Sequence, residues 1–345
     1  DATTATETLA VPATSRVTAV PRNTLGTGDD VAHDFSATVS CTNGQLIVAE
    51  RPMYFDYMGW TGGHDVVGAA ATGTAFYFAE GTCRPNFEPY LSIQNPSGVA
   101  ADVLITYMKG NGAIATELLT VPVNSRVTAY PRGTLGTGDD VAHDFSTKVE
   151  CTNGQQIIAE RPMYFNYNGW AGGHAVVGST VSSTAFYFAE GTCRPNFEPY
   201  ICVQNPGGTA ADVTITYMKG NADTATQSVT VARNSRVTVM PRTVLGTGDD
   251  VAYDFSAKVE CTNGQQIIAE RPMYFNYNGW TGGHAVVGVP EAATASVPPT
   301  IAVTPGTGMR KFVDTLPGVG AANANNLGQY LPVAVPDTDT YLGSY

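Results

Sequence analysis

Charged residues are scarce in this 345-residue sequence, at 14% of the total, against roughly 25% in ordinary soluble domains. Only 18 residues are Lys or Arg, and the formal net charge is −12. A surface of this sign repels phosphate groups, which argues against nucleic acid and anionic membranes as partners. No apolar run approaches the roughly 20 residues that a membrane-spanning helix needs, so no membrane span is predicted.

Sequence signatures of metal binding and catalysis are also lacking. The chain has no Cys-x-x-Cys, His-x-His, His-Glu-x-x-His or Gly-x-Ser-x-Gly segment. Zinc sites, thioredoxin-like redox chemistry and serine hydrolase activity are therefore poorly supported. We predict no cofactor, and we expect this segment not to be an enzyme. No segment shows a convincing helical period of 3.6 residues.

An internal repeat of 110 residues organises the sequence. The pentapeptide RPMYF begins at Arg51, Arg161 and Arg271, and LGTGDDVA begins at positions 25, 135 and 245. Comparison of residues 75–110 with 185–220 gives six differences in 36 positions. The predicted organisation is a partial repeat that lacks its first strands, two complete repeats, and a Pro/Ala/Thr linker with an extended tail. These segments are 1–69 (repeat 1), 75–179 (repeat 2), 185–289 (repeat 3) and 290–345.

The period of 110 residues is the size of one immunoglobulin-like domain. Short segments of apolar or alternating character are separated by Asn-Pro, Asn-Gly and Gly-Gly turns. In the segment 101–108, alternation places Val103, Ile105 and Tyr107 on one face. We therefore predict an all-β fold, a tandem array of immunoglobulin-like β-sandwiches with seven or eight short strands per complete repeat.

The cysteines fit a disulfide framework in an oxidising compartment. Two pairs lie 68 residues apart within a repeat, and a bridge closing each loop would contribute roughly 4 kcal/mol. Pairing between repeats, Cys41 with Cys83 and Cys151 with Cys193, is an alternative. The predicted pairs within repeats are Cys83–Cys151 and Cys193–Cys261, and the candidates for unpaired or intermolecular cysteines are Cys41 and Cys202.

The acidic GTGDD turn is a candidate calcium site, because Ca²⁺ takes Asp and backbone oxygens. Its carboxylates are Asp29, Asp30, Asp139, Asp140, Asp249 and Asp250. We favour a plain acidic turn over a metal site. We also favour structural roles for the histidines, since repeat 3 has Tyr253 where the other repeats have His33 and His143.

Aromatic residues near the GWxGGH segment are candidates for stacking against sugar rings. They are Tyr167, Trp170, Tyr277 and Trp280. The interpretation that we favour is that such side chains fill the sandwich core and cover its rim. Next to them, Glu160 and Arg161 are adjacent on a predicted strand and so point to opposite faces. We expect each to pair with another strand rather than to act in catalysis.

Two resemblances follow from these motifs. The runs FAEGTCRPNFEPYLSIQNP and AERPMYFNYNGWAGGH resemble a tandem repeat of secreted, surface-attached bacterial proteins, over residues 1–289. This resemblance implies an extracellular location more than an activity. The stretch 309–341 is similar to the lead-in to bacterial multicopper oxidases, although the copper-binding His-x-His motifs are absent from this chain. That resemblance implies an oxidase domain beyond the sequence given.

Taken together, these features predict a non-catalytic extracellular structural protein that builds a surface fibre, sheath or stalk. Self-association by strand exchange is expected, with residues 300–340 packing on another subunit or on repeat 1. The alternatives are a non-catalytic N-terminal spacer of a secreted multicopper oxidase and an adhesin that contacts carbohydrate or a cell surface.

Overall fold

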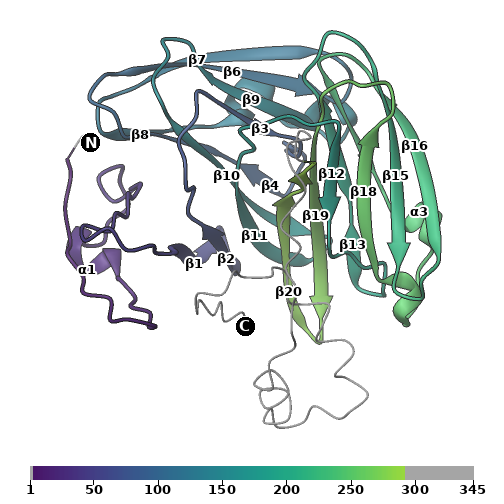
Figure 1. The fold of residues 1–345 in the computed structure, drawn as a ribbon, viewed down its shortest axis with the longest axis horizontal. Helices are drawn as coiled ribbons and strands as arrows, with labels where there is room; N and C mark the ends of the chain where they lie inside the picture. The colour runs from purple at the N-terminus through teal and green to yellow at the C-terminus, as the bar shows by residue number, and fades with distance from the viewer. Residues whose placement is uncertain (1–2, 292–345) are drawn as a thin grey trace. The chain divides into compact units, whose positions relative to one another are not determined.

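The computed structural model describes residues 3–291, which form antiparallel sheets with only single turns of helix (Figure 1). Residues Leu25–Glu291 lie in one compact unit, and Thr6–Thr24 fall outside it. In the latter segment the Thr24 hydroxyl donates to the Glu7 carboxylate at 3.2 Å. The prediction of an all-β sandwich fold is confirmed, while its immunoglobulin-like character stays a prediction. The predicted packing of residues 300–340 lies outside the described residues.

Repeat 2 is built from two sheets and a short linking segment. The first sheet has the order β3-β9-β6-β7, and the second has the order β11-β10-β5-β8 with β4 also paired to β10. The link between β8 and β9 contains the helical turns α2 and η1. The strands of the first sheet are β3 (Ala75–Phe78), β6 (Ala101–Lys109), β7 (Ile114–Val121) and β9 (Phe145–Cys151). Those of the second are β4 (Phe87–Pro89), β5 (Leu91–Asn95), β8 (Ser125–Ala129), β10 (Ile158–Tyr167) and β11 (Trp170–Val177), and the turns are α2 (Pro131–Leu135) and η1 (Val141–His143).

Repeat 3 has the same arrangement 110 residues later, with one added strand. Its first sheet has the order β16-β15-β18-β12-β21, and in its second sheet β19 pairs with β13, β14 and β20 while β17 pairs with β14. The first sheet comprises β12 (Ala185–Phe188), β15 (Ala211–Lys219), β16 (Thr224–Val231), β18 (Phe255–Cys261) and β21 (Val289–Pro290). The second comprises β13 (Phe197–Pro199), β14 (Ile201–Asn205), β17 (Ser235–Val239), β19 (Ile268–Tyr277) and β20 (Trp280–Val287), with turns α3 (Arg242–Leu245) and η2 (Val251–Tyr253).

Each complete repeat has its own apolar core. The alternation in β6 places Val103, Ile105 and Tyr107 in that core with no exposed surface, as predicted. Asn95 is also fully buried, and its side-chain amide donates to the carbonyl oxygens of residues 99, 121 and 122. Because a buried amide needs partners, this residue fixes the loops at one end of the sandwich.

A two-residue turn closes the hairpin β10–β11. Asn168 and Gly169 have φ angles of 51° and 89°, so both lie in the left-handed region. This is the geometry of a type I′ turn, which matches the twist of antiparallel strands and favours Asn-Gly. The turn sets the register Tyr167↔Trp170 through Glu160↔Val177, which recurs at the same offset in β19–β20.

Repeat 1 forms much less regular structure than its sequence predicts. Its elements are α1 (Pro21–Leu25), β1 (Glu50–Tyr57) and β2 (Trp60–Val67). Residues 35–41 form no strand, although the matching sequence forms β9 in repeat 2. Phe35 and Val39 are 41% and 64% exposed, whereas Phe145 and Val149 are fully buried. The difference follows from the missing counterpart of residues 75–110, because β9 is hydrogen-bonded between β3 and β6.

The predicted disulfides within repeats are wrong, because all six cysteines are free. The backbone N–H of Cys83 donates to His143 O, and that of Cys151 donates to Thr74 O. The two residues therefore lie at opposite ends of the β3–β9 ladder, eight positions or about 27 Å apart at the rise of a strand. A disulfide requires Cα atoms within about 7 Å. In repeat 3, Cys193 and Cys261 are separated in the same way. The alternative pairing between repeats is not formed either.

Candidate functional site: the stacked hairpins between repeats

The GWxGGH strands of the three repeats pack against one another, with β11 in contact with both β2 and β20 (Figure 1). The contact depends on glycine. A Cβ added to Gly62 would lie 3.1 Å from the Gly172 Cα, and one added to Gly172 would lie 2.9 Å from the Gly282 Cα. A real Cβ would not fit between these backbones without movement. The glycines of successive repeats therefore allow a backbone-to-backbone approach.

Aromatic side chains lock each hairpin onto the next one. Phe55 lies against Gly173 and makes an edge contact with Tyr164, with ring centroids 4.8 Å apart and planes at 82°. One repeat later, Phe165 lies against Gly283 and makes an edge contact with Tyr274 at 4.8 Å and 87°. Edge-to-face pairs of this kind are worth about 0.5–1.5 kcal/mol beyond their buried area.

Paired tyrosine hydroxyls repeat the same correspondence. The hydroxyl oxygens of Tyr57 and Tyr90 are 2.7 Å apart, and those of Tyr167 and Tyr200 are also 2.7 Å apart. Both pairs join one repeat to the next, and their residue numbers differ by 110. The tyrosine pair therefore recurs at both junctions, between repeats 1 and 2 and between repeats 2 and 3.

A buried ion cluster lies in the interface between repeats 2 and 3. The Arg161 guanidinium is fully buried and contacts the Glu80 carboxylate at 2.5 Å and the Glu270 carboxylate at 3.0 Å. The first partner belongs to the same repeat as Arg161 and the second to the next repeat. Burial raises the pKa of Glu80 to about 7, opposed by the Arg161 charge. The cluster confirms the expectation that Arg161 pairs with other strands.

The equivalent arginines of repeats 1 and 3 each have one carboxylate partner, whereas Arg161 has two. Arg51 bonds Glu160 of repeat 2 at 2.8 Å. Arg271 bonds Glu190 of its own repeat at 2.6 Å, and among the described residues no carboxylate of a further repeat reaches it. Burial lowers the pKa of Arg271, whereas the two carboxylates around Arg161 raise the pKa of that side chain despite its burial. The end of the array thus has half of the ion cluster.

Polar groups of the two sheets complete the interface between repeats 2 and 3. The Ala79 N–H donates to the Glu270 carboxylate at 2.7 Å, and the Arg236 Nε donates to the Ala79 carbonyl at 3.2 Å. The Gln204 amide donates to the Thr147 carbonyl at 3.2 Å. Buried hydrogen bonds of this kind fix the alignment of the repeats, because misalignment would leave polar groups without partners.

His174 lies in the middle of the stack and is buried. Neither of its ring nitrogens has a hydrogen-bond partner in the structure. Burial, aided by the nearby Arg161 charge, lowers the pKa of His174 well below its usual value. His64, less enclosed, has a pKa lowered to about 4, again chiefly by burial. These two side chains are therefore neutral packing groups near pH 7.

Five of the six carboxylates in the acidic turns have local partners. Asp140 caps the η1 turn by accepting from the Ala142 N–H at 2.9 Å, and it contacts His143 at 2.8 Å. Its neighbour Asp139 bonds Arg84 at 3.0 Å. The matching contacts in the other repeats involve Asp30, Asp249 and Asp250. Within residues 3–291, no three His, Cys, Asp or Glu side chains gather where they could hold a metal ion.

The candidate sugar-stacking aromatics divide by position in the array. Tyr167 stacks on Tyr274 of the next repeat, with ring centroids 4.6 Å apart and planes at 19°, and Trp170 packs beside Tyr167. Tyr277 and Trp280 are 58% and 77% exposed. The favoured interpretation, that such rings fill the sandwich core and cover its rim, does not include the contact between repeats that Tyr167 makes.

The two cysteines without a predicted partner have different surroundings. Cys202 is buried and accepts a hydrogen bond from Arg236 at 2.9 Å. It replaces Ser92, whose hydroxyl accepts from Arg126 in repeat 2. Burial raises the pKa of the Cys202 thiol to about 11, which suppresses thiolate chemistry. Cys41 is half-buried and donates to the Asn43 side chain at 2.9 Å.

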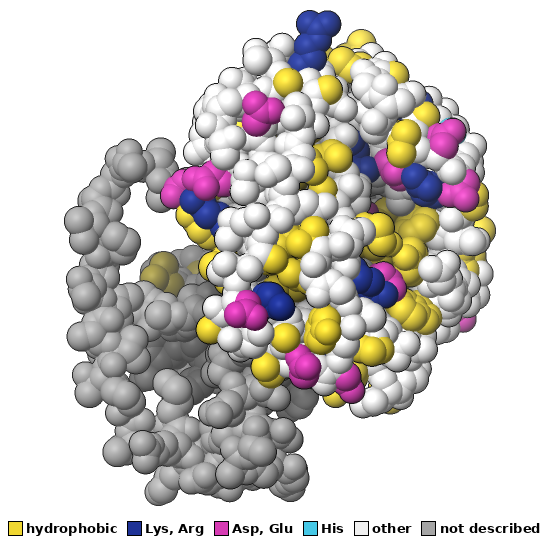
Figure 2. Space-filling model, turned by 90° about the vertical axis from the view of Figure 1, so that its right-hand side faces the viewer, with side chains coloured by type: hydrophobic (Ala, Val, Ile, Leu, Met, Phe, Trp, Pro, Cys, Tyr) yellow, Lys and Arg dark blue, Asp and Glu magenta, His cyan; other side chains and the backbone are white. Residues whose placement is uncertain are grey.

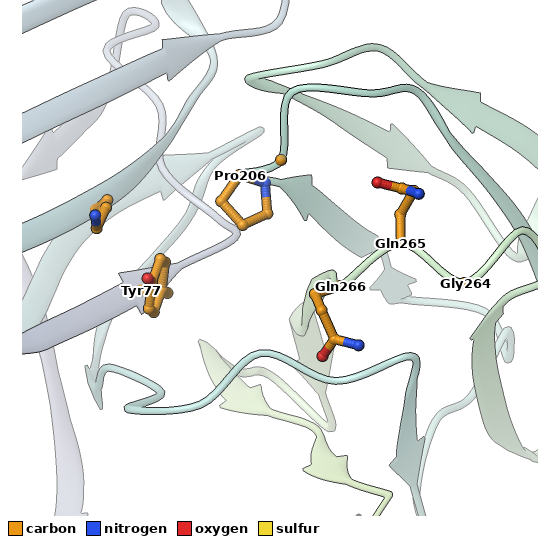
Figure 3. Close-up of a pocket in the computed structure, with 7 residues that line it drawn as sticks. Tyr77, Pro206, Gly264, Gln265 and Gln266 are labelled. Carbon is orange, nitrogen blue, oxygen red and sulfur yellow. The ribbon is translucent and has the colours of Figure 1, made fainter.

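A pocket of about 300 Å³ opens between repeats 2 and 3, away from the hairpins. Tyr77 stands on one side and the loop residues Pro206, Gln265 and Gln266 on the other (Figure 3). Lys148 is its one ionisable lining residue besides the tyrosine. This lining has no acid–base pair or nucleophile with an adjacent base, which acid–base and covalent catalysis require.

The outer face of repeat 3, which bears β15, β16 and α3, has few charges. Figure 2 shows basic side chains beside acidic ones in small groups, which are separated by uncharged and hydrophobic surface. None of the helices in the described part of the chain has the length and apolar character needed to cross a membrane.

Comparisons with known proteins give little. No protein-family model matches the chain, and no curated protein matches it. Among solved structures, Thermotoga maritima 1070 has 12% identity and a TM-score of 0.28 over 32% of this chain and 96% of that one. The Anabaena sensory rhodopsin transducer has 18% identity and a TM-score of 0.23 over 26% and 96%. A CBM22 tandem domain of Paenibacillus barcinonensis Xyn10C has 7% identity and a TM-score of 0.16 over 65% and 90%. Similarities this weak carry no argument.

Proposed function

We propose that the chain is a non-catalytic extracellular structural protein whose repeats build a surface fibre, sheath or stalk. One observation carries the proposal, namely that one set of contacts recurs at both junctions between repeats. Gly–Gly approach, an Arg–Glu pair and a Tyr–Tyr pair join repeat 1 to repeat 2 and repeat 2 to repeat 3. Side chains that a lone domain would leave in water are here used to join domains.

The location outside the cell is supported by composition and by the resemblance to repeats of secreted surface proteins. Because all six cysteines are free, disulfides do not support a location outside the cell. The proposed location therefore depends on the composition and on the resemblance. Few charges and a Thr-, Ser- and Gly-rich sequence remain typical of secreted β-proteins. Labelling of intact cells with an antibody against repeat 2 tests this directly, and signal only after lysis would contradict it.

The structural role is tested by electron microscopy of the purified full chain over a range of concentrations. We expect elongated assemblies of uniform width. A chain that stays monomeric at all concentrations would contradict a fibre or sheath role.

Binding of a carbohydrate surface is a second candidate, supported by the exposure of Tyr277 and Trp280 on the last hairpin. Exposed aromatic rings next to each other can stack against sugar faces. A glycan array with the full chain and with a Trp280→Ala variant tests this function. Binding that depends on Trp280 would support it, and an array without signal would remove it.

A further inference from the structure

The stack of hairpins has two different ends, and both are uncovered among the described residues. We define the leading face of a hairpin as the side that meets the preceding repeat, and the trailing face as the side that meets the next. Tyr164 and Tyr274 are leading-face residues and lie against the preceding repeat, whereas the equivalent Tyr54 is 86% exposed. Among trailing-face residues, exposure is greater in the last repeat: Tyr167 of repeat 2 is half-buried, whereas the equivalent Tyr277 of repeat 3 is 58% exposed. The exposed leading face is therefore on repeat 1, and the exposed trailing face is on repeat 3.

The two exposed faces carry complementary charges at matching positions. On the trailing face, Arg271 lacks the second carboxylate that Arg161 receives from Glu270. On the leading face of repeat 1, Glu50 is the counterpart of Glu160 and Glu270, and it is exposed. Both pairs that have formed within the chain join an arginine of one repeat to this glutamate of the next.

The shapes of the two faces also match. Gly173 and Gly283 receive the Phe rings of the preceding hairpins, whereas the three atoms nearest to a Cβ on their counterpart Gly63 all belong to its own hairpin. The three atoms nearest to a Cβ on Gly282 all belong to the Phe275 ring of its own hairpin, whereas the atom nearest to one on Gly172 is the Gly282 Cα of the next repeat. Each exposed face thus has the features that its partner face requires.

We infer that the trailing face of repeat 3 binds the leading face of repeat 1 of a second copy of this chain. This inference rests on the proposed structural function and specifies the partner and the contact. The interface is heterologous, since different surfaces meet, and repetition generates an open polymer rather than a symmetric dimer. Arg271 pairs with Glu50, Tyr277 with Tyr54, and Phe275 with Gly63 across the contact.

The contact places two particular residues next to each other. Within the chain, the Thr281 hydroxyl of repeat 3 donates to the Ala171 carbonyl of repeat 2 at 3.2 Å. The same relation between two chains brings Thr61 of one copy to Thr281 of the other, and both residues are exposed. A Cys at each position would then be close enough for oxidative cross-linking.

The test uses two full-length variants, Thr61→Cys and Thr281→Cys, each in a Cys41→Ser background because the other five cysteines are buried. We expect a disulfide-linked dimer when the two variants are mixed and oxidised, and at least tenfold less from either variant alone. A double variant with Ala171→Cys and Thr281→Cys is the matched control, since it should link within one chain.

The outcomes separate the inference from the proposed function. Cross-linking of a single variant with itself would show a contact between like faces and overturn the head-to-tail inference. Assemblies that form in the microscope without a cross-link in the mixture would overturn the assignment of faces and leave the structural function standing. A full chain that remains monomeric would overturn both.

Discussion

Replacement of Gly172 by alanine tests whether the glycine contact holds repeats 2 and 3 together. The added Cβ would lie 2.9 Å from the Gly282 Cα and 3.0 Å from the Phe165 ring. The backbone of repeat 3 cannot yield as a flexible side chain can, so the stack must open slightly. Overpacking of this kind costs about 1–3 kcal/mol, and the lower chain entropy of alanine offsets about 0.5–1 kcal/mol.

Gly282→Ala is the matched control, because it makes the same substitution at the end of the array. The atoms nearest to its Cβ belong to the movable Phe275 ring, at 3.0 Å, so we expect the free energy of unfolding to change by less than about 1 kcal/mol. Urea unfolding of the full-length variants, followed by near-UV circular dichroism, measures both effects. Equal losses in the two variants would refute the reasoning, because the cost would then come from within the hairpin. By the inference above, Gly282→Ala should nevertheless weaken association between chains.

Three further predictions concern single side chains. Burial lowers the folded-state pKa of His174, so its contribution to stability is complete above the unfolded pKa of about 6.5 and is lost as the pH falls below that value. Below about pH 6.5 the wild-type chain should therefore lose about 1.4 kcal/mol of stability per pH unit relative to a His174→Phe variant. Urea titrations at pH 7 to 5 would measure this difference. Arg161→Met leaves two buried carboxylates unpaired and should lower the free energy of unfolding by about 3–5 kcal/mol. Arg271→Met leaves one half-exposed carboxylate unpaired, so the loss measured by urea unfolding should be clearly smaller. Met58 has a φ of 56°, in the left-handed region, at a position where repeats 2 and 3 have asparagine. Met58→Asn should therefore raise the thermal midpoint of unfolding by relieving about 1 kcal/mol of backbone strain. An unchanged or lower midpoint would contradict this.

Strands were predictable where the sequence alternates, and turns were predictable where Asn-Gly occurs. The core positions of β6 follow from alternation alone. The fate of residues 35–41 did not follow from their own sequence, because a strand needs neighbours on the sheet to satisfy its backbone groups. The β3–β9 register likewise depends on tertiary pairing, and it separates the cysteines that simple spacing had paired.

The interface between repeats was largely missed at the sequence level. Its signal was present, since a double glycine within a strand indicates a close backbone approach, and the segments GWxGGH and ERP recur in all three repeats. Sequence patterns alone could not tell whether the aromatic rings beside them fill a core or a contact between domains. That distinction depends on which hairpin lies against which, and so on geometry between repeats.

The buried ion cluster has a consequence for the proton balance of the stack. Glu80 has a raised pKa, of about 7, so its contribution is complete below its unfolded value and is lost as the pH rises through about 7. His174, beside the same arginine, has a lowered pKa and responds in the opposite direction. In mildly acidic water, Glu80 takes up a proton when the chain folds, whereas His174 releases one. Their effects on stability oppose each other, so acidification should change the strength of the joint between repeats less than either group alone would.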